Sequence, residues 1–160
     1  MIELTVAATD EQLFAELYPG LRRFAAVVGP SDVHPDDLVQ EALARRLAIG
    51  PLTELDDAGQ YLRRAIVHLA ANRRRSLRRA ARAGALLAAT DESAAATYPS
   101  DLADLARLTA RERGAVYLHH VEGFSFAEVG AQLGCSEVAA RQAAARARRR
   151  LRATMREEDA

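Results

Sequence analysis

Apolar residues recur every three or four positions along most of this chain, and no segment alternates between apolar and polar positions. The first spacing is that of amphipathic helices, whereas strict alternation would indicate strands. Residue types that cap or break helices stand at the ends of these periodic segments. The pattern therefore predicts an all-α fold.

Two helices are expected before residue 52. Thr9 and Gln12 can form a capping box that opens the first helix, and Gly29-Pro30 ends it. Pro35 suits the first turn of the second helix, where the acids that follow it meet the positive end of the helix dipole. Gly50-Pro51 closes this second helix.

A third and longer helix is expected from a cap at Asp57 and Gln60 to about residue 80. Its apolar face is expected to pack on the first two helices through Leu62, Ile66, Leu69 and Leu77. The opposite face carries Arg64, His68, Asn72, Arg75 and Arg79.

Residues 83–100 differ in composition from what precedes them. They are rich in small residues, lack clear amphipathic periodicity and end near a proline, as linkers do. No internal repeat relates the sequences on either side. We therefore expect two different small helical domains, residues 1–82 and residues 101–160, joined by a flexible linker.

Helix caps in the second half predict a helix-turn-helix. The capping boxes are Thr109 with Glu112 and Ser125 with Glu128. Gly134 can end the short helix in a left-handed conformation, and Ser136 can cap the long basic helix that follows. A short helix, a tight turn and a basic helix form the motif that places its second helix in the major groove of DNA. The alternative is an ordinary helical hairpin with a basic tail.

The charges are segregated, although the chain is formally neutral and has 22 basic residues, all Arg. Residues 1–60 hold eleven acids and four Arg, whereas residues 61–90 hold eight Arg and no acid. Like charges on one helix repel, and no acid lies three or four positions away to pair with them. A solvated Arg-rich face is one interpretation, and binding of an external polyanion, which would relieve the repulsion, is the other.

Other functional classes find little support. No apolar run is long enough for a membrane span and no signal peptide is evident, so a cytoplasmic protein with no membrane partner is expected. An enzyme is the weaker alternative, with His34, His119, His120 and Cys135 as its candidate residues. Adjacent histidines on a helix point about 100° apart, and no carboxylate pattern completes a metal or nucleophile site. No cofactor, metal or catalytic residue is expected.

The order of these segments resembles a known family. "DDLVQEALARRL", then "YLRRAIVHLAANRRRSLRR", a linker, and "LTARERGAVYLHHVEGFSFAEVGAQLGCS" before an Arg-rich helix are similar to bacterial RNA polymerase sigma factors of the extracytoplasmic function (ECF) type, in the sigma-70 family. The resemblance covers roughly residues 10–153. It implies a sigma region 2 domain of three helices, a sigma region 4 helix-turn-helix domain, and a factor that starts transcription at promoters.

The resemblance also implies sites in the first half. The segment that docks on the β′ clamp helices of core RNA polymerase would present Asp37, Gln40, Glu41 and Arg45, with Val39, Leu43 and Leu47 facing the domain core. The Arg-rich helix matches the element that captures one strand of the melted minus-ten region. Its candidate contacts are Tyr61, Arg64, His68, Asn72, Arg73 and Arg75.

The last helix matches the element that reads the minus-thirty-five duplex. Its buried stripe would be Ala140, Ala144, Ala147 and Leu151, and its DNA contacts Arg141, Gln142, Ala145, Arg146 and Arg149. The implied partners are promoter DNA and core RNA polymerase, through the β′ clamp helices and the β flap, and an anti-sigma factor is a further candidate. The alternative function is a helix-turn-helix regulator that binds DNA without polymerase.

Overall fold

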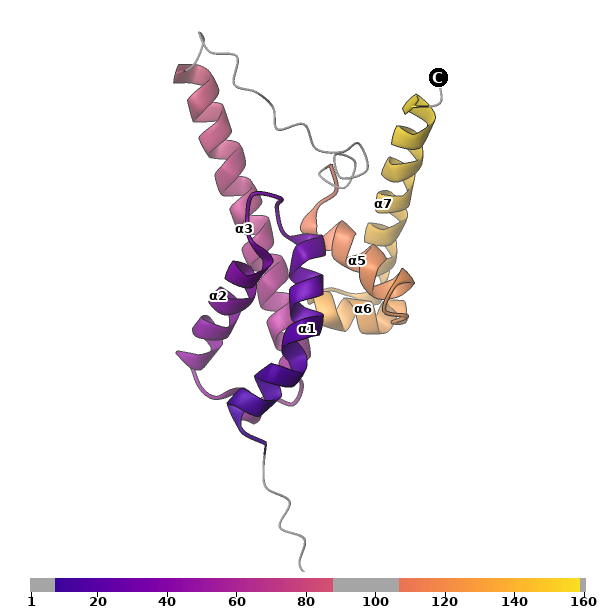
Figure 1. The fold of residues 1–160 in the computed structure, drawn as a ribbon. Coiled ribbons are helices and arrows are strands. Elements are labelled where there is room, and N and C mark those ends of the chain that lie inside the picture. Colours follow the sequence, from indigo (N-terminus) through magenta and orange to yellow (C-terminus); the bar gives the residue numbers. More distant parts are fainter. Residues whose placement is uncertain (1–7, 88–106, 159–160) are drawn as a thin grey trace, which may run out of the picture.

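The computed structural model describes residues 8–87 and 107–158, and within these ranges the chain forms helices and no strand. The elements are α1 (Asp10–Val28), α2 (Pro35–Leu47), the short 3-10 helix η1 (Leu52–Glu54), α3 (Ala58–Leu87), α5 (Ala110–His120), α6 (Phe126–Leu133) and α7 (Glu137–Glu158). The all-α prediction is confirmed. Figure 1 shows α3 and α7 diverging from the place where the other helices pack together.

The predicted helix ends are confirmed where local hydrogen bonds determine them. Capping boxes open α1 at Thr9, α5 at Thr109 and α6 at Ser125. Gly134 ends α6 in the left-handed region, with φ 70°, where a residue with a Cβ would be strained. Each of these ends is therefore encoded within about one helical turn of sequence.

Helix α3 is longer than predicted. It runs to Leu87 rather than to about residue 80, so the first five residues of the expected linker, 83–87, are helical. Residues 88–100, the rest of that linker, lie outside the described residues. The prediction for Leu77 was wrong, because its side chain is 38% exposed beyond the end of the packed face.

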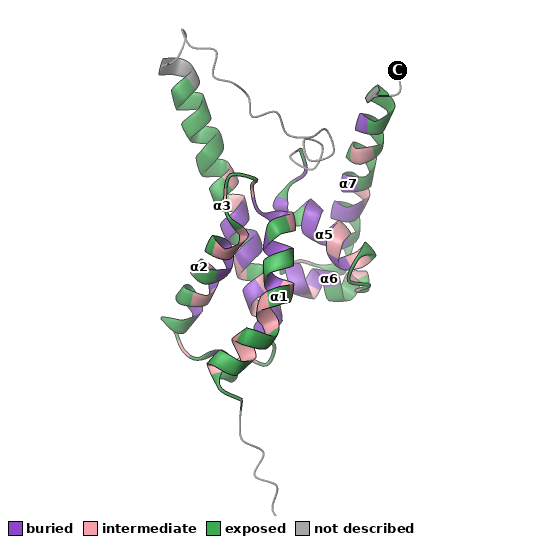
Figure 2. Ribbon diagram, in the orientation of Figure 1, coloured by how far each residue is buried: buried purple, intermediate pink, exposed green. Residues whose placement is uncertain are grey.

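Large apolar side chains fill the core of the first half. Helices α1, α2 and α3 bury Leu21, Phe24, Leu38, Leu62 and Ile66, each with at most 1% of its surface exposed. The predicted stripe of α3 is thus confirmed at Leu62, Ile66 and also Leu69, which is 4% exposed. Figure 2 shows this buried face continuing toward α5 and α6.

The second half packs closely on the first through an aromatic contact and a glycine of α5. The Phe24 ring in α1 lies 6.3 Å from the Tyr117 ring in α5, centroid to centroid. A Cβ added to Gly114 in α5 would lie 3.0 Å from Leu133 Cδ2 and 3.4 Å from Val28 Cγ1. Because residues of both halves belong to one buried cluster, the helix-turn-helix packs directly on α1 and α3.

Candidate nucleic-acid interface

The turn of the helix-turn-helix depends on close backbone contact. The Gly134 N–H donates to Gly130 O, and the Ala139 N–H donates to Ser136 Oγ at 3.1 Å, which caps α7 as predicted. A Cβ on Gly130 would lie 2.6 Å from the carbonyl oxygen of Cys135. Only glycine therefore allows α6 to approach the turn this closely, and that approach sets the direction of α7.

Alanines form the buried face of α7. Ala140, Ala144 and Ala147 are fully buried, as predicted, and Ala143 is buried beside them. The predicted Leu151 is only half-buried. Short side chains let α7 lie close to α5 and α6 and leave its long polar side chains on the opposite face.

Four of the five residues predicted to contact the upstream duplex lie exposed on that opposite face: Arg141, Gln142, Arg146 and Arg149. Ala145, the fifth, is half-buried. Arg141 pairs with Glu137 at 2.7 Å, and its guanidinium lies 5.0 Å from the centre of the Phe126 ring. Arg149 makes no ion pair within the described part of the chain, so its charge faces solvent.

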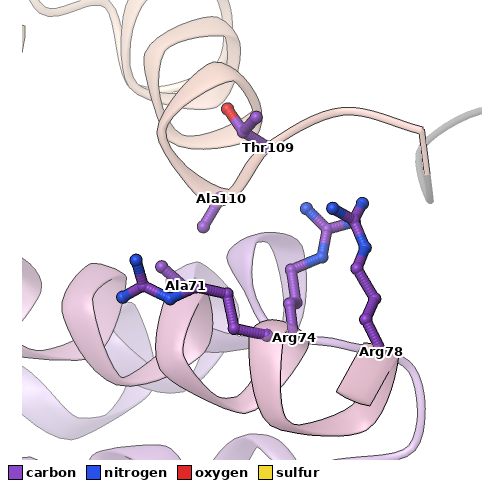
Figure 3. Close-up of a pocket in the computed structure, with 6 residues that line it drawn as sticks. Ala71, Arg74, Arg78, Thr109 and Ala110 are labelled. Atoms are coloured by element: carbon purple, nitrogen blue, oxygen red, sulfur yellow. The ribbon is translucent and has the colours of Figure 1, made fainter. Parts of the chain in front are cut away.

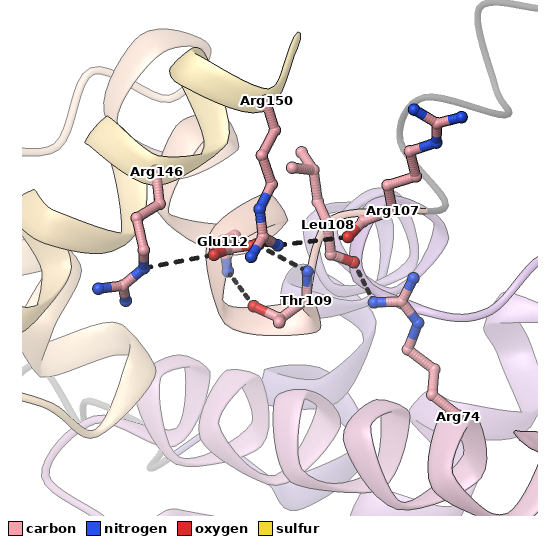
Figure 4. A network of polar contacts seen from close by, with 7 residues as sticks. All are labelled: Arg74, Arg107, Leu108, Thr109, Glu112, Arg146 and Arg150. Atoms are coloured by element: carbon pink, nitrogen blue, oxygen red, sulfur yellow. Dashed lines mark hydrogen bonds and ion pairs between the residues drawn. The ribbon is translucent and has the colours of Figure 1, made fainter. Parts of the chain in front are cut away.

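A buried carboxylate holds two arginines of α7 (Figure 4). The Glu112 side chain is 4% exposed, and its carboxylate accepts from Arg150 Nη1 at 2.9 Å and from Arg146 Nε at 3.4 Å. The same carboxylate accepts the Thr109 N–H at 3.0 Å. The capping box in the sequence predicted only the capping role of Glu112; the arginines one turn apart on the basic helix were the signal for its second role.

Five of the six predicted downstream contacts are exposed along α3: Arg64, His68, Asn72, Arg73 and Arg75. Tyr61 is half-buried, and the Arg46 guanidinium lies 5.5 Å from the centre of its ring. Tyr61, Arg64, His68, Asn72 and Arg75 thus lie in one row over about four turns, whereas Arg73 points about 100° away from Asn72, toward α2. Arg75 donates to Asn72 within the row, and Arg73 pairs with Glu41 of α2 at 2.9 Å.

The four residues predicted to dock on polymerase lie on the outer side of α2. Asp37, Gln40 and Arg45 are exposed, and Glu41 is partly covered. The hydrogen bond from Arg73, together with the charge of Arg45 at 2.6 Å, holds the pKa of Glu41 below its ordinary value.

Two inward positions of α2 differ from the prediction. Val39 is buried and Leu43 partly buried as expected, but Leu47 is 47% exposed, so its predicted core position was wrong. Arg46 is buried instead, with 8% exposure, because its guanidinium donates to the carbonyl of Pro51 and lies 3.7 Å from Glu54. Through these contacts, Arg46 links the end of α2 to the loop that follows it.

Arginines of the first half also bond to the second half. Arg63 donates to Gln132 Oε1 at 3.0 Å, and Arg64 donates to the carbonyl of Ala131 at 2.7 Å. Arg74 donates to the carbonyl of Leu108. These partners lie 34 to 69 residues apart along the chain, so the sequence offered no local signal for them.

One arginine of α5 makes the reverse connection. Arg113 is 8% exposed and donates to the carbonyls of Val27, at 3.2 Å, and Gly29, at 3.1 Å. Burial, with the nearby charge of Arg74, lowers the pKa of Arg113 to about 10. These bonds satisfy the carbonyls at the end of α1, which lack partners within the helix.

The candidate residues of the enzyme alternative have structural contacts. His119 Nδ1 lies 2.7 Å from the carbonyl oxygen of Phe124, and its ring stacks on Phe126 at 4.0 Å. His34 caps α2 by accepting the Asp36 N–H. In the parts of the chain that the structure describes, no group of three or more His, Cys, Asp or Glu could hold a metal ion. No helix among those residues is long and apolar enough to span a bilayer.

Comparison with known proteins identifies the helix-turn-helix. Residues 105–151 match the family model for sigma-70, region 4, a span that includes α5, α6 and most of α7. A search of curated proteins gave no match. The second half is therefore similar to region 4 of sigma-70 factors.

A solved structure extends the likeness to the whole chain. The sigma factor RpoE of Bartonella quintana, determined in complex with the anti-sigma factor NepR, shares the fold with a TM-score of 0.64 and 22% identity. The likeness covers 91% of this chain and 96% of that one. The chain as a whole thus shares the fold of a solved sigma factor, and its second half also matches a family model of sigma-70.

Proposed function

We propose that this protein is a cytoplasmic sigma factor that binds core RNA polymerase and directs it to promoters. The observation that carries the proposal is the exposed face of α7, on which Arg141, Arg146 and Arg149 stand on a region 4 helix-turn-helix. Arginine can bond both major-groove acceptors of a guanine, and further arginines neutralise phosphates. This face would read the minus-thirty-five duplex.

The row of exposed polar residues on α3 would bind the melted minus-ten strand. His68 and Asn72 offer donors and acceptors for base edges, and the surrounding arginines offer charge for the backbone. Tyr61 lies at the start of the row and can stack on a base only with the part of its ring that stays exposed. Recognition here would therefore depend on hydrogen bonds more than on stacking.

The outer side of α2 would dock on the β′ clamp helices, while the second half would meet the β flap. Asp37 and Gln40 are exposed without a role in the core of the domain, which suits an interface with another protein. An anti-sigma factor is a further proposed partner, because the similar RpoE was determined in complex with one. Such an anti-sigma factor would compete with polymerase and DNA for the surfaces that α2, α3 and α7 present.

We also propose that residues 83–100 connect two helical domains, residues 1–82 and residues 101–160. Because α3 is helical to Leu87, limited proteolysis should first cut after that residue and before α5 begins. First cuts inside α1, α5 or α7 would contradict this division.

The proposed function is tested by transcription in vitro with bacterial core polymerase on a genomic promoter library. The protein should bind the core enzyme and produce discrete transcripts whose start sites share an upstream and a downstream element. Specific binding to duplex DNA without any binding to core polymerase would instead indicate a stand-alone helix-turn-helix regulator.

A further inference from the structure

A small cavity lies where α3 passes the beginning of α5. Its volume is about 200 Å³, and it is lined by Ala71, Arg74, Arg75, Arg78, Thr109 and Ala110. Figure 3 shows the guanidinium groups of Arg74 and Arg78 beside each other, on the side of the cavity that faces the start of α5. The lining therefore combines three arginines of one helix with the N-terminus of another.

A second cavity shares two of these arginines. It has a volume of about 180 Å³ and is lined by Pro30, Ser31, Arg74, Leu77, Arg78 and Arg113. Arg113 is more than nine-tenths buried, and its Nε has no hydrogen-bond partner. Burial lowers the pKa of Arg74, and the charge of Arg78 lowers it further. The guanidinium groups of Arg74, Arg78 and Arg113 thus lie close together at a site that water reaches only in part.

Within the described parts of the chain, few negative charges compensate this cluster. Arg78 makes no ion pair within residues 8–87 and 107–158. Arg74 donates to the carbonyl of Leu108, and Glu112, which faces it, is also bonded to two arginines of α7. Gathering like charges in a concave site costs free energy unless an anion occupies it.

The start of α5 adds hydrogen-bond donors on the other side of the cavity. The capping box uses the N–H groups of Thr109 and Glu112. The N–H groups of Ala110 and Arg111 have no partner among the described residues. Free amides in the first turn, at the positive end of the helix dipole, bind phosphate groups.

We propose that the first cavity, which is lined by Arg74, Arg75, Arg78 and the start of α5, binds a small phosphate-bearing anion through a diphosphate group. The anion is either free pyrophosphate or the diphosphate of a nucleotide. Arginine forks match phosphate oxygens two at a time, and the α5 amides bond the oxygens that remain. A volume of about 200 Å³ suits a diphosphate and is below the usual size of pockets that enclose larger ligands.

An adjoining cavity could take a nucleoside attached to that diphosphate. It has a volume of about 390 Å³ and shares Ala71, Thr109 and Ala110 with the first. Its remaining lining is Val67, His68, Arg111, Glu112 and Arg146. Since the anion would touch both α3 and α5, its binding favours the packed arrangement of the two halves. The site needs neither DNA nor polymerase and so goes beyond the proposed function.

The test is isothermal titration of the intact chain with inorganic pyrophosphate and, separately, with ADP and GDP, at about 150 mM salt. Arg78→Gln should weaken binding by about tenfold or more, the effect of losing one charged hydrogen-bonding partner. Arg82→Gln is the matched control, because Arg82 is exposed on the same helix and lines none of these cavities. The control should stay within about twofold of the wild type.

The two sources of phosphate give different results. Tighter binding of ADP or GDP than of pyrophosphate supports a nucleotide, and equal binding supports free pyrophosphate. Slower hydrogen exchange in the first turn of α5 on addition of ligand would support the site independently of any variant. The proposal would be overturned if none of the three ligands bound, or if the two variants lost binding equally. Slower hydrogen exchange at Arg78 with duplex DNA but with none of the three ligands would also overturn it.

Discussion

The two basic helices of this protein, α3 and α7, engage their arginines differently. On α7, Arg146 and Arg150 bond to Glu112, and Arg141 bonds to Glu137, all within the second half of the chain. On α3, Arg64 and Arg74 instead donate to backbone carbonyls of the opposite half. One helix is held by carboxylates of its own half, and the other forms part of a contact between halves.

This difference bears on how each helix could become available to DNA. The face of α7 would be the same whether the halves are packed or apart, because its partners move with it. Arg64 of α3, a proposed minus-ten contact, is engaged by the Ala131 carbonyl while the halves are packed. We therefore expect separation of the halves to change the surface of α3 more than that of α7.

The largest effect is expected from damage to the support of α7. Gly130→Ala should lower the free energy of unfolding by about 1–3 kcal/mol, because the new Cβ meets the Cys135 carbonyl, a backbone atom that cannot turn away. Gly84→Ala is the control, since nothing lies within 4 Å of its Cβ position in exposed α3, and it should stabilise by about 0.5–1 kcal/mol. Chemical denaturation followed by circular dichroism measures both, and a tolerated Gly130→Ala would contradict the close turn.

The second prediction separates the two carboxylates that hold α7. Glu112→Gln keeps a capping side chain but loses the charge between Arg146 and Arg150. It should destabilise the fold by about 1–2 kcal/mol, a value between the energies typical of surface and of buried ion pairs. Glu137→Gln removes an exposed pair with Arg141 and should cost no more than about 0.5 kcal/mol. Thermal unfolding of both variants is the measurement, and equal effects would show that burial of Glu112 contributes nothing.

The third prediction addresses the contact between halves. Arg64→Ala removes a hydrogen bond to Ala131 and should destabilise by about 0.5–1.5 kcal/mol, with a wider distribution of distances between labels placed on the two halves. Arg79→Ala, an exposed change on the same helix, should alter neither quantity. Paired spin labels report the distances. An unchanged distribution in Arg64→Ala would show that this bond does not hold the halves together.

The smallest effect concerns pH. Since Arg73 and Arg45 lower the pKa of Glu41 in the folded protein, the pair stabilises the fold above the unfolded pKa of Glu41, and this stabilisation is lost as pH falls through the folded value. The difference in stability between wild type and Glu41→Gln should be below about 1 kcal/mol at neutral pH and should vanish once the pH falls below the folded pKa of Glu41. Denaturation at several pH values checks this, and a difference that grows with acidity would have the wrong sign.

Local signals in the sequence predicted much of the fold. The capping boxes at Thr9, Thr109 and Ser125 and the left-handed cap at Gly134 involve neighbouring residues only, so their chemistry can be read directly. The end of α3 was misjudged because residues 81–87 contain no proline, and a lone glycine in a run rich in alanine is tolerated within a helix. Small-residue composition, the lack of amphipathic periodicity and the proline near residue 100 were taken there as the signals of a linker.

Contacts between distant residues could not be predicted. Periodicity indicated that Leu47 and Leu77 lie on apolar faces, but burial also requires a neighbour, and both positions lie where none packs. The burial of Arg46 and Arg113 depends on carbonyl groups supplied by other elements. For the candidate site, the sequence predicted which arginines are exposed on α7 but not which carboxylate holds them.

The central claim is that α3 and α7 serve different parts of a promoter. It is tested most directly by binding of the protein with core polymerase to two probes from one mapped promoter, a single strand of the minus-ten element and a duplex of the minus-thirty-five element. Asn72→Ala should weaken only the single-strand probe, and Arg149→Ala only the duplex, with the salt dependence of duplex binding reduced by about one ion. Equal losses on both probes for both variants would contradict the claim.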